Sequence, residues 1–272
     1  MPHGGQETEI DEIVAHVQAS RKYRHVCATT IRRIAAEESA KRDTLKRAIK
    51  ATKSRLHQAH GAYEAKLNYA RAYRDLSAAY ASGDDLGIRA VCHQLLSLHA
   101  STRERLPILH RFYDAVYAHT GVPHALLDLA CGLNPLALPW MRLGSGTVYH
   151  AYDIDGERIA FLNRFFALTD VDGCAYCQDL ICDPPPQRAD LALLLKTATC
   201  LERQRQGSTV ALLDQLDVAH VVVTFPVKSL GQREKGMAEH YEHTFLGMIS
   251  IRPWAVARLD LVTELVFIVD KR

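Results

Sequence analysis

The pattern of apolar residues along the chain changes at Gly121-Val-Pro123, and this change limits the possible folds more than any other feature. After this point, short apolar runs alternate with helix-like stretches. Such alternation is typical of a parallel sheet that is covered by helices on both faces. We therefore predict a doubly wound, Rossmann-like α/β domain that ends in two antiparallel strands after residue 251. Its parallel strands are expected at residues 125–130, 147–152, 175–178, 190–196 and 220–225.

The residues before this change have a helical pattern. Between residues 11 and 118, apolar residues recur at helical spacing, as at Ile31, Ile34 and Ala35. Glycine and proline interrupt the pattern without any strand-like alternation. We expect four to six helices here. The chain would then comprise a helical domain, residues 1–119, and an α/β domain, residues 120–272.

Charge is unevenly distributed along the chain. The net charge of the 272 residues is only +2, but residues 21–60 carry twelve Lys and Arg against three acidic residues. A solvated helix face is the usual meaning of such a run. Because this excess has one sign and is not interleaved with the other, we favour a polyanionic partner held at this face.

Other features limit the location and the chemistry. No apolar run approaches the roughly 18 residues that a membrane span needs, and the acidic N-terminus lacks the pattern of a signal peptide. We expect a cytoplasmic protein that uses no membrane. Seven scattered cysteines do not suggest a disulfide framework, and Cys174-x-x-Cys177 lacks a second pair of ligands nearby. We therefore expect no metal site.

A glycine and two acids follow the first three predicted strands. Gly132 comes directly after the first strand, Asp153 ends the second, and Asp179 follows the third. The glycine lets backbone approach a ligand, Asp153 can accept hydrogen bonds from ribose hydroxyls, and Asp179 can accept one from an adenine amino group. Each of these residues alone could instead belong to a tight turn or cap a helix. Together they favour S-adenosylmethionine over a nicotinamide cofactor, because glycines that cradle a diphosphate are missing.

Several strings of residues resemble one family. They include Ser20-Arg-Lys-Tyr23, His99-Ala-Ser-Thr-Arg-Glu-Arg-Leu106, Asp128-Leu-Ala-Cys-Gly-Leu-Asn-Pro135 and Thr224-Phe-Pro-Val-Lys-Ser-Leu-Gly231. In these strings the chain resembles the 16S rRNA (guanine-N7) methyltransferases that give aminoglycoside resistance by modifying guanine 1405 (rRNA numbering). The resemblance covers nearly the whole chain. It implies a class I S-adenosylmethionine methyltransferase domain, an N-terminal helical domain and the 30S ribosomal subunit as substrate.

The resemblance also implies a cofactor pocket. Arg105 would pair with the methionine carboxylate, a bidentate task that suits a guanidinium group. The alternative is a surface salt bridge of Arg105 with Glu104 or Asp114. The implied pocket comprises Tyr63, His99, Ala100, Ser101, Arg105, Ala130, Gly132, Asp153, Asp179, Leu180, Leu195 and Gln204.

The chemistry of guanine N7 needs little from the enzyme, because N7 carries an unprotonated lone pair and requires no general base. The catalytic candidates are Lys196, which would hold the flipped nucleotide, and Glu202 and Glu264, which would stabilise the cationic product. Buried structural pairing is the alternative for both acids.

Basic residues of two segments are the candidates for contact with rRNA. The helical domain offers Arg21, Lys22, Arg32, Arg33, Lys41, Arg42, Lys46, Arg47, Lys50, Lys53 and Arg55. The loop after the fifth strand offers Lys228, Ser229, Arg233 and Lys235.

Two rival classes stay open from the sequence. One is a methyltransferase that acts on another RNA, on DNA or on a small molecule, with the helical half as a lid. The other is a non-catalytic RNA-binding protein that retains the fold. We expect this chain to be a monomer.

Overall fold

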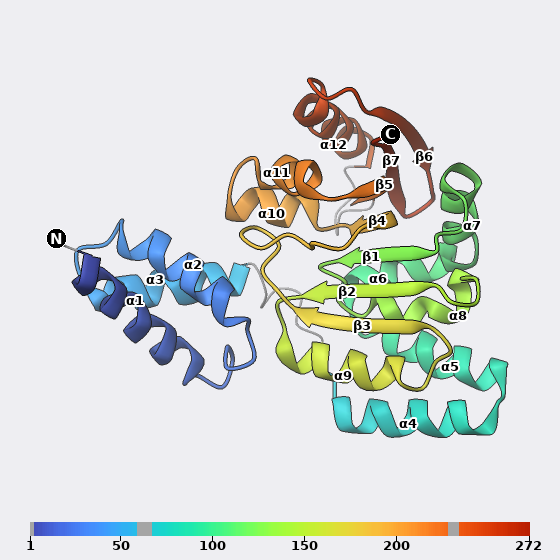
Figure 1. Cartoon of the computed structure of the whole chain (residues 1–272), viewed down its shortest axis with the longest axis horizontal. Helices are drawn as coiled ribbons and strands as arrows, with labels where there is room; N and C mark the ends of the chain where they lie inside the picture. Colours follow the sequence, from blue (N-terminus) through green and yellow to red (C-terminus); the bar gives the residue numbers. More distant parts are fainter. Residues whose placement is uncertain (1–2, 59–66, 228–233) are drawn as a thin grey trace.

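The computed structural model describes residues 3–58, 67–227 and 234–272. These residues contain a seven-stranded sheet, which Figure 1 shows with helices packed around it. The strands lie in the order β3-β2-β1-β4-β5-β7-β6. The first five are parallel, whereas β7 is antiparallel to both β5 and β6. This confirms the predicted α/β fold and the terminal antiparallel pair. The strands are β1 (Ala125–Leu129), β2 (Val148–Asp153), β3 (Asp172–Cys177), β4 (Ala189–Leu195), β5 (Val218–Pro226), β6 (Ala255–Asp260) and β7 (Glu264–Asp270).

The central strands are apolar on both faces, which explains their position in the sheet. Successive side chains of a strand point to opposite faces. Leu193 of β4 accordingly belongs to one buried cluster, and Leu194 belongs to the other. Val222 and Val223 of β5 divide in the same way. Such near-continuous apolar runs are typical of strands that are covered on both sides.

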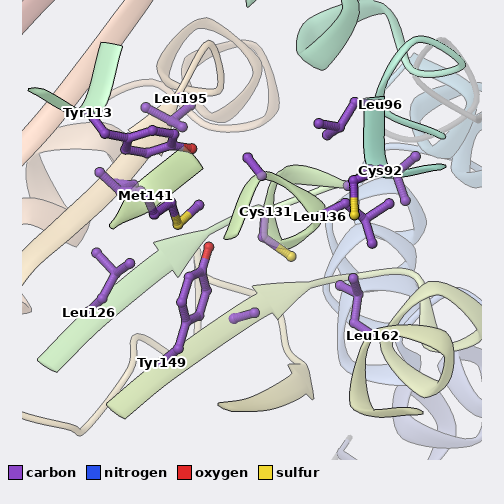
Figure 2. Close-up of a cluster of buried hydrophobic side chains, with 14 of the residues drawn as sticks. Cys92, Leu96, Tyr113, Leu126, Cys131, Leu136, Met141, Tyr149, Leu162 and Leu195 are labelled. Atoms are coloured by element: carbon purple, nitrogen blue, oxygen red, sulfur yellow. The ribbon is translucent and has the colours of Figure 1, made fainter. Parts of the chain in front are cut away.

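Helices from both halves of the chain cover the sheet. Figure 2 shows Cys92 beside Leu136, with Leu126 and Tyr149 on two neighbouring strands. This face is covered by α4 (Tyr69–Ser82), α5 (Asp85–Leu96), α7 (Leu109–Thr120), α8 (Leu138–Met141) and α9 (Gly156–Phe166). The other face is covered by α10 (Ala198–Gln204), α11 (Ser208–Gln215) and α12 (Glu234–Ile249).

The helical half contains more helices than predicted and divides into two groups. The described part of residues 3–120 forms seven α-helices, because Pro107 interrupts the last stretch and separates α6 (Ala100–Arg105) from α7. Only α1 (His3–Gln18), α2 (Ala28–Ser39) and α3 (Leu45–Leu56) share a core of their own, around Ile13, Ile31 and Ile34. The division of the chain at residue 119 stays a prediction.

The helices α1–α3, called here the three-helix unit, sit at the carboxyl ends of β2 and β3, where the strand arrows end in Figure 1. The backbone N–H of Cys27 donates to the carbonyl of Ile154 at 2.7 Å, and that of Gly156 donates to His25 at 2.7 Å. The unit is therefore anchored at the strand ends. Within the described ranges, no helix has the length and apolar character that a membrane crossing requires.

Candidate active site

A cavity of about 390 Å³ opens at the carboxyl ends of the parallel strands. Residues that follow β1, β2, β3 and β4 line it, together with α6, α10 and Arg33 of α2. Every predicted cofactor residue except Tyr63 belongs to this lining, and Tyr63 falls outside the described residues. The structure therefore brings these predicted residues together around one cavity. The lining members are His99, Ala100, Ser101, Arg105, Ala130, Gly132, Asp153, Asp179, Leu180, Leu195 and Gln204.

The turn after β1 has an unusual backbone. Ala130 and Gly132 have φ values of +52° and +55°, in the left-handed region that costs a residue with a side chain on the order of 1–2 kcal/mol. A Cβ added to Gly132 would lie 3.4 Å from Cε1 of His99. The glycine thus keeps open the space between the turn and α6.

Asp153 is held in place from three sides. Its Oδ2 accepts the backbone N–H of Gly132 at 3.0 Å, and its Oδ1 accepts that of Asp155 at 3.0 Å and Nη1 of Arg158 at 2.9 Å. Burial lowers the pKa of Arg158, but Asp153 and Asp155 outweigh burial, so that the net pKa is raised. The carboxylate is therefore fixed at the cavity wall.

Asp179 is fixed by the three-helix unit. Its Oδ1 accepts the backbone N–H of Ile181 at 2.9 Å, and its Oδ2 accepts Nε of Arg33 at 2.8 Å. Nη2 of the same arginine donates to Oε1 of Gln204 at 2.8 Å. Arg33 is only 8% exposed.

The assignment of Arg33 and Arg55 to an rRNA-facing surface is therefore wrong. Nη2 of Arg55 donates to the backbone carbonyl of Gln204 at 2.7 Å, and its Nη1 pairs with Glu37 and Glu38. A run of charges in the sequence does not reveal which face of a helix each charge occupies. Arg33 and Arg55 lie where the three-helix unit meets the α/β domain.

Arg105 lies in a buried ion cluster. Its Nε is 2.9 Å from Oε1 of Glu264, and its Nη1 donates to Asn134 at 3.0 Å. Nζ of Lys196 lies 3.1 Å from the same Oε1 and 2.8 Å from Oε2 of Glu104. Burial lowers the pKa of Arg105, but the nearby Glu264 outweighs burial and raises it. A surface salt bridge of Arg105 with Glu104 or Asp114 is therefore excluded.

The two acids proposed for catalysis do not line the cavity. Glu264 is fully buried beneath it in the pair with Arg105. Glu202 accepts the backbone N–H groups of Gly207 and Thr209 at 2.7 and 2.8 Å, and so caps the start of α11. Lys196 does line the cavity, with a left-handed φ of +59° at the end of β4.

Several lining residues escaped the sequence analysis as site residues, and Asp128 and Arg203 are two of the charged ones. Oδ2 of Asp128 accepts the hydroxyl of Tyr149 at 2.6 Å and Nδ2 of Asn134 at 2.9 Å, whereas its buried Oδ1 has no hydrogen-bond partner among the described residues. Burial raises the pKa of Asp128 to about 6. Arg203, an exposed residue of α10, also lines the cavity. Asp128 could have been recognised as the acid of the Asp-Leu-Ala-Cys-Gly string. Nothing in the sequence singled out Arg203.

The rRNA candidates are mostly exposed. Apart from Arg33 and Arg55, only Lys53 among the candidates of the three-helix unit is half-buried. The exposed ones are Arg21, Lys22, Arg32, Lys41, Arg42, Lys46, Arg47 and Lys50. Arg47 pairs with Asp43, and Nζ of Lys22 lies 2.9 Å from Nδ1 of His57. The structure does not describe Lys228, Ser229, Arg233 or the side chain of Lys235.

The strand order and the cavity at the strand ends define the class, a Rossmann-like methyltransferase with added N-terminal helices. Solved structures of the same arrangement support this. The 16S rRNA methyltransferase RmtF in complex with S-adenosyl-L-homocysteine is 32% identical, with a TM-score of 0.81, over 97% of this chain and 98% of that chain. The 16S rRNA methylase RmtB is also 32% identical, with a TM-score of 0.79 and the same coverage.

Residues 19–268 match the model of the family described as ribosomal RNA methyltransferase (FmrO), and the chain belongs to this family. The names of similar proteins agree with this family. A 16S rRNA (guanine(1405)-N(7))-methyltransferase of Micromonospora echinospora is 41% identical over 100% of both chains. One of Frankia casuarinae is 41% identical over 99% of this chain and 96% of that protein. The resemblance found in the sequence is confirmed.

Proposed function

We propose that this chain transfers a methyl group from S-adenosylmethionine to N7 of guanine 1405 in the 16S rRNA of the 30S subunit, and so gives resistance to aminoglycosides. The observation that carries the proposal is the 41% identity, over the full length of both chains, to a relative with this named activity. The proposal includes a monomer that acts in the cytoplasm, where 30S subunits are found.

The cavity residues fit S-adenosylmethionine. The cavity of about 390 Å³ falls within the range of small-molecule sites, roughly 300–1,000 Å³. Asp153 suits the ribose hydroxyls and Asp179 the adenine amino group. The unpartnered Oδ1 of Asp128 suits an ammonium group. Arg105 has N–H donors beyond those that Glu264 and Asn134 use, so it can also meet a carboxylate.

The bound cofactor supplies an electrophilic methyl group, and the chain mainly has to hold the acceptor base in line with it. Guanine N7 keeps its lone pair without a general base. Lys196 is suited to holding the nucleotide or its phosphate, because it lines the cavity and its side chain is fixed by Glu104 and Glu264. The base has to leave its stack to reach such a cavity.

The exposed basic side chains of the three-helix unit support its role in docking on rRNA. Lys46 and Lys50 stand on α3 and form no ion pair with any residue that the structure describes. Arg21 and Lys22 are exposed on the same unit. Exposed cations of this kind gain affinity for RNA by displacing counterions from its phosphates.

The test supplies labelled S-adenosylmethionine and 30S subunits to the purified chain and maps 7-methylguanine by borohydride–aniline cleavage. We expect a single cleavage at guanine 1405. Cleavage at another nucleotide, or labelling of duplex DNA or free nucleosides instead, would favour another methyltransferase activity. Cofactor binding without transfer to any of these substrates would favour a non-catalytic RNA-binding protein.

A further inference from the structure

We infer that Arg33, on α2 of the three-helix unit, is a positioning residue that makes the cofactor cavity selective for adenine. The inference rests on S-adenosylmethionine as the cofactor in the proposed function, but not on the identity of the rRNA target.

The geometry places one guanidinium group between two lining residues. Nε of Arg33 donates to Oδ2 of Asp179 at 2.8 Å, and Nη2 donates to Oε1 of Gln204 at 2.8 Å. Asp179 follows β3 and Gln204 ends α10, so the arginine of α2 ties two separate elements together. A guanidinium group can serve two such acceptors at once because its donors form a rigid planar fork. A lysine has no such fork.

The direction of these hydrogen bonds decides what the cavity can offer a ligand. Arginine only donates, so the side-chain oxygen of Gln204 is occupied and its NH₂ group remains to donate. The carboxylate of Asp179, held by Arg33 and by the backbone of Ile181, remains an acceptor. Both residues line the cavity. This wall therefore presents one fixed acceptor and one fixed donor.

Adenine has the complementary pattern. Its exocyclic amino group donates and its adjacent ring nitrogen accepts, whereas hypoxanthine has an accepting carbonyl oxygen and a donating ring N–H at these positions. A hypoxanthine ring would set its oxygen against the carboxylate of Asp179. Sites with fixed, buried polar groups reject such analogues strongly, because the groups are left unpaired.

Further contacts show that the three-helix unit holds this wall as a whole. Nη2 of Arg55 donates to the backbone carbonyl of Gln204 at 2.7 Å, and Oε1 of Glu37 pairs with Arg205 at 2.6 Å. The unit thus completes the cofactor site in addition to carrying the exposed basic side chains of α3.

The experiment measures the affinity of the full chain, without rRNA, for S-adenosylhomocysteine and for its deaminated analogue S-inosylhomocysteine by isothermal titration calorimetry. We expect the wild type to prefer the adenine compound by on the order of 100-fold. Arg33→Met should bind S-adenosylhomocysteine at least about 10-fold more weakly and reduce the preference below about 10-fold, because both wall groups lose their partner. Arg32→Met is the matched control, since Arg32 is the exposed neighbour on α2 and pairs with Asp11 within the unit.

Gln204→Glu provides the second variant. Its carboxylate still accepts from Arg33, so the contact between the unit and α10 is kept, but its NH₂ donor is gone. We expect the fold to be retained and the preference for adenine to fall by about 10-fold. This variant decides the question if Arg33→Met does not fold.

The outcomes are separable. If the wild type does not bind S-adenosylhomocysteine, the cofactor assignment in the proposed function fails as well. If it binds with the expected preference, but folded Arg33→Met or Gln204→Glu keeps the wild-type preference, the role of Arg33 alone is overturned. Methylation at a nucleotide other than guanine 1405 would change the proposed function and leave this inference in place.

Discussion

Charged side chains serve two regions of this molecule in different ways. Around the cavity, several charged groups are buried and paired, as Asp153 is with Arg158 and Asp179 with Arg33. On α3, Lys46 and Lys50 stand in solvent, and neither forms an ion pair with the described part of the chain. Buried charges interact strongly and lose much when a partner is removed, whereas exposed charges are screened by salt. Cofactor binding should therefore depend on single residues, and rRNA binding on the sum of many.

The largest expected effect is that of Asp153→Asn. The change leaves the buried Arg158 without its 2.9 Å carboxylate partner and weakens the acceptor for Gly132. We expect the affinity for S-adenosylhomocysteine to fall by about 100-fold or more, equivalent to roughly 2.7 kcal/mol. Isothermal titration calorimetry measures it, with the exposed Asp75→Asn of α4 as control. Wild-type affinity in folded Asp153→Asn would contradict the role of this carboxylate.

The second effect is a pH dependence of stability that Asp128 contributes. Burial raises its pKa from 3.8 to about 6 in the folded chain, so the folded state holds this proton more tightly. The contribution to stability is then complete below pH 3.8 and is lost as the pH rises through about 6. The expected size is about 2–3 kcal/mol.

This effect is isolated by urea unfolding of the wild type and of Asp128→Asn at several pH values from 4 to 8. The free energy of unfolding of the variant, relative to the wild type, should rise with pH across this window. A difference in the free energy of unfolding that stays constant with pH would show that burial does not shift the pKa of Asp128. Asp128 would then titrate like an exposed acid.

A smaller effect is expected for the exposed cations. Lys46→Ala and Lys50→Ala should each weaken binding to 30S subunits a few-fold and reduce the slope of log affinity against log salt by about 1. Thermal stability should not change. Filter binding at several salt concentrations measures the slope, and Arg74→Ala, an exposed change on α4, is the matched control. An unchanged slope in both lysine variants would move rRNA docking away from α3.

The smallest effect is expected for Glu202→Gln. Because Glu202 caps α11 and does not line the cavity, we expect turnover on 30S subunits to stay within about twofold and stability to fall by about 0.5–1 kcal/mol. Single-turnover methylation and thermal unfolding provide the two measurements. A large loss of turnover with an intact fold would restore the electrostatic role for this acid.

The sequence predicted the sheet well because its signals are local. The continuous apolar run of β4 and the acid that ends β2 can be recognised without knowing their neighbours. The strand ends then place Gly132, Asp153 and Asp179 together through the rule that parallel strands share one carboxyl edge. The other predicted residues of the cavity lining were implied by the family resemblance.

The partners of the charged residues could not be predicted, because they are distant in the sequence. Arg33 meets Asp179 only through the docking of the three-helix unit, and Arg105 meets Glu264 only through the position of β7. Helical periodicity likewise indicated helices but not their partners, so it did not reveal that α4, α5 and α7 pack on the sheet.

The reversed direction of β7 has a consequence for the order of events during synthesis. Because β7 runs against its neighbour β5, its first residue, Glu264, reaches the edge where the parallel strands end. Arg105 and Lys196 emerge from the ribosome long before this carboxylate, and until then they are two cations without their shared counterion. The ion cluster is therefore completed only by a strand that is translated after β5.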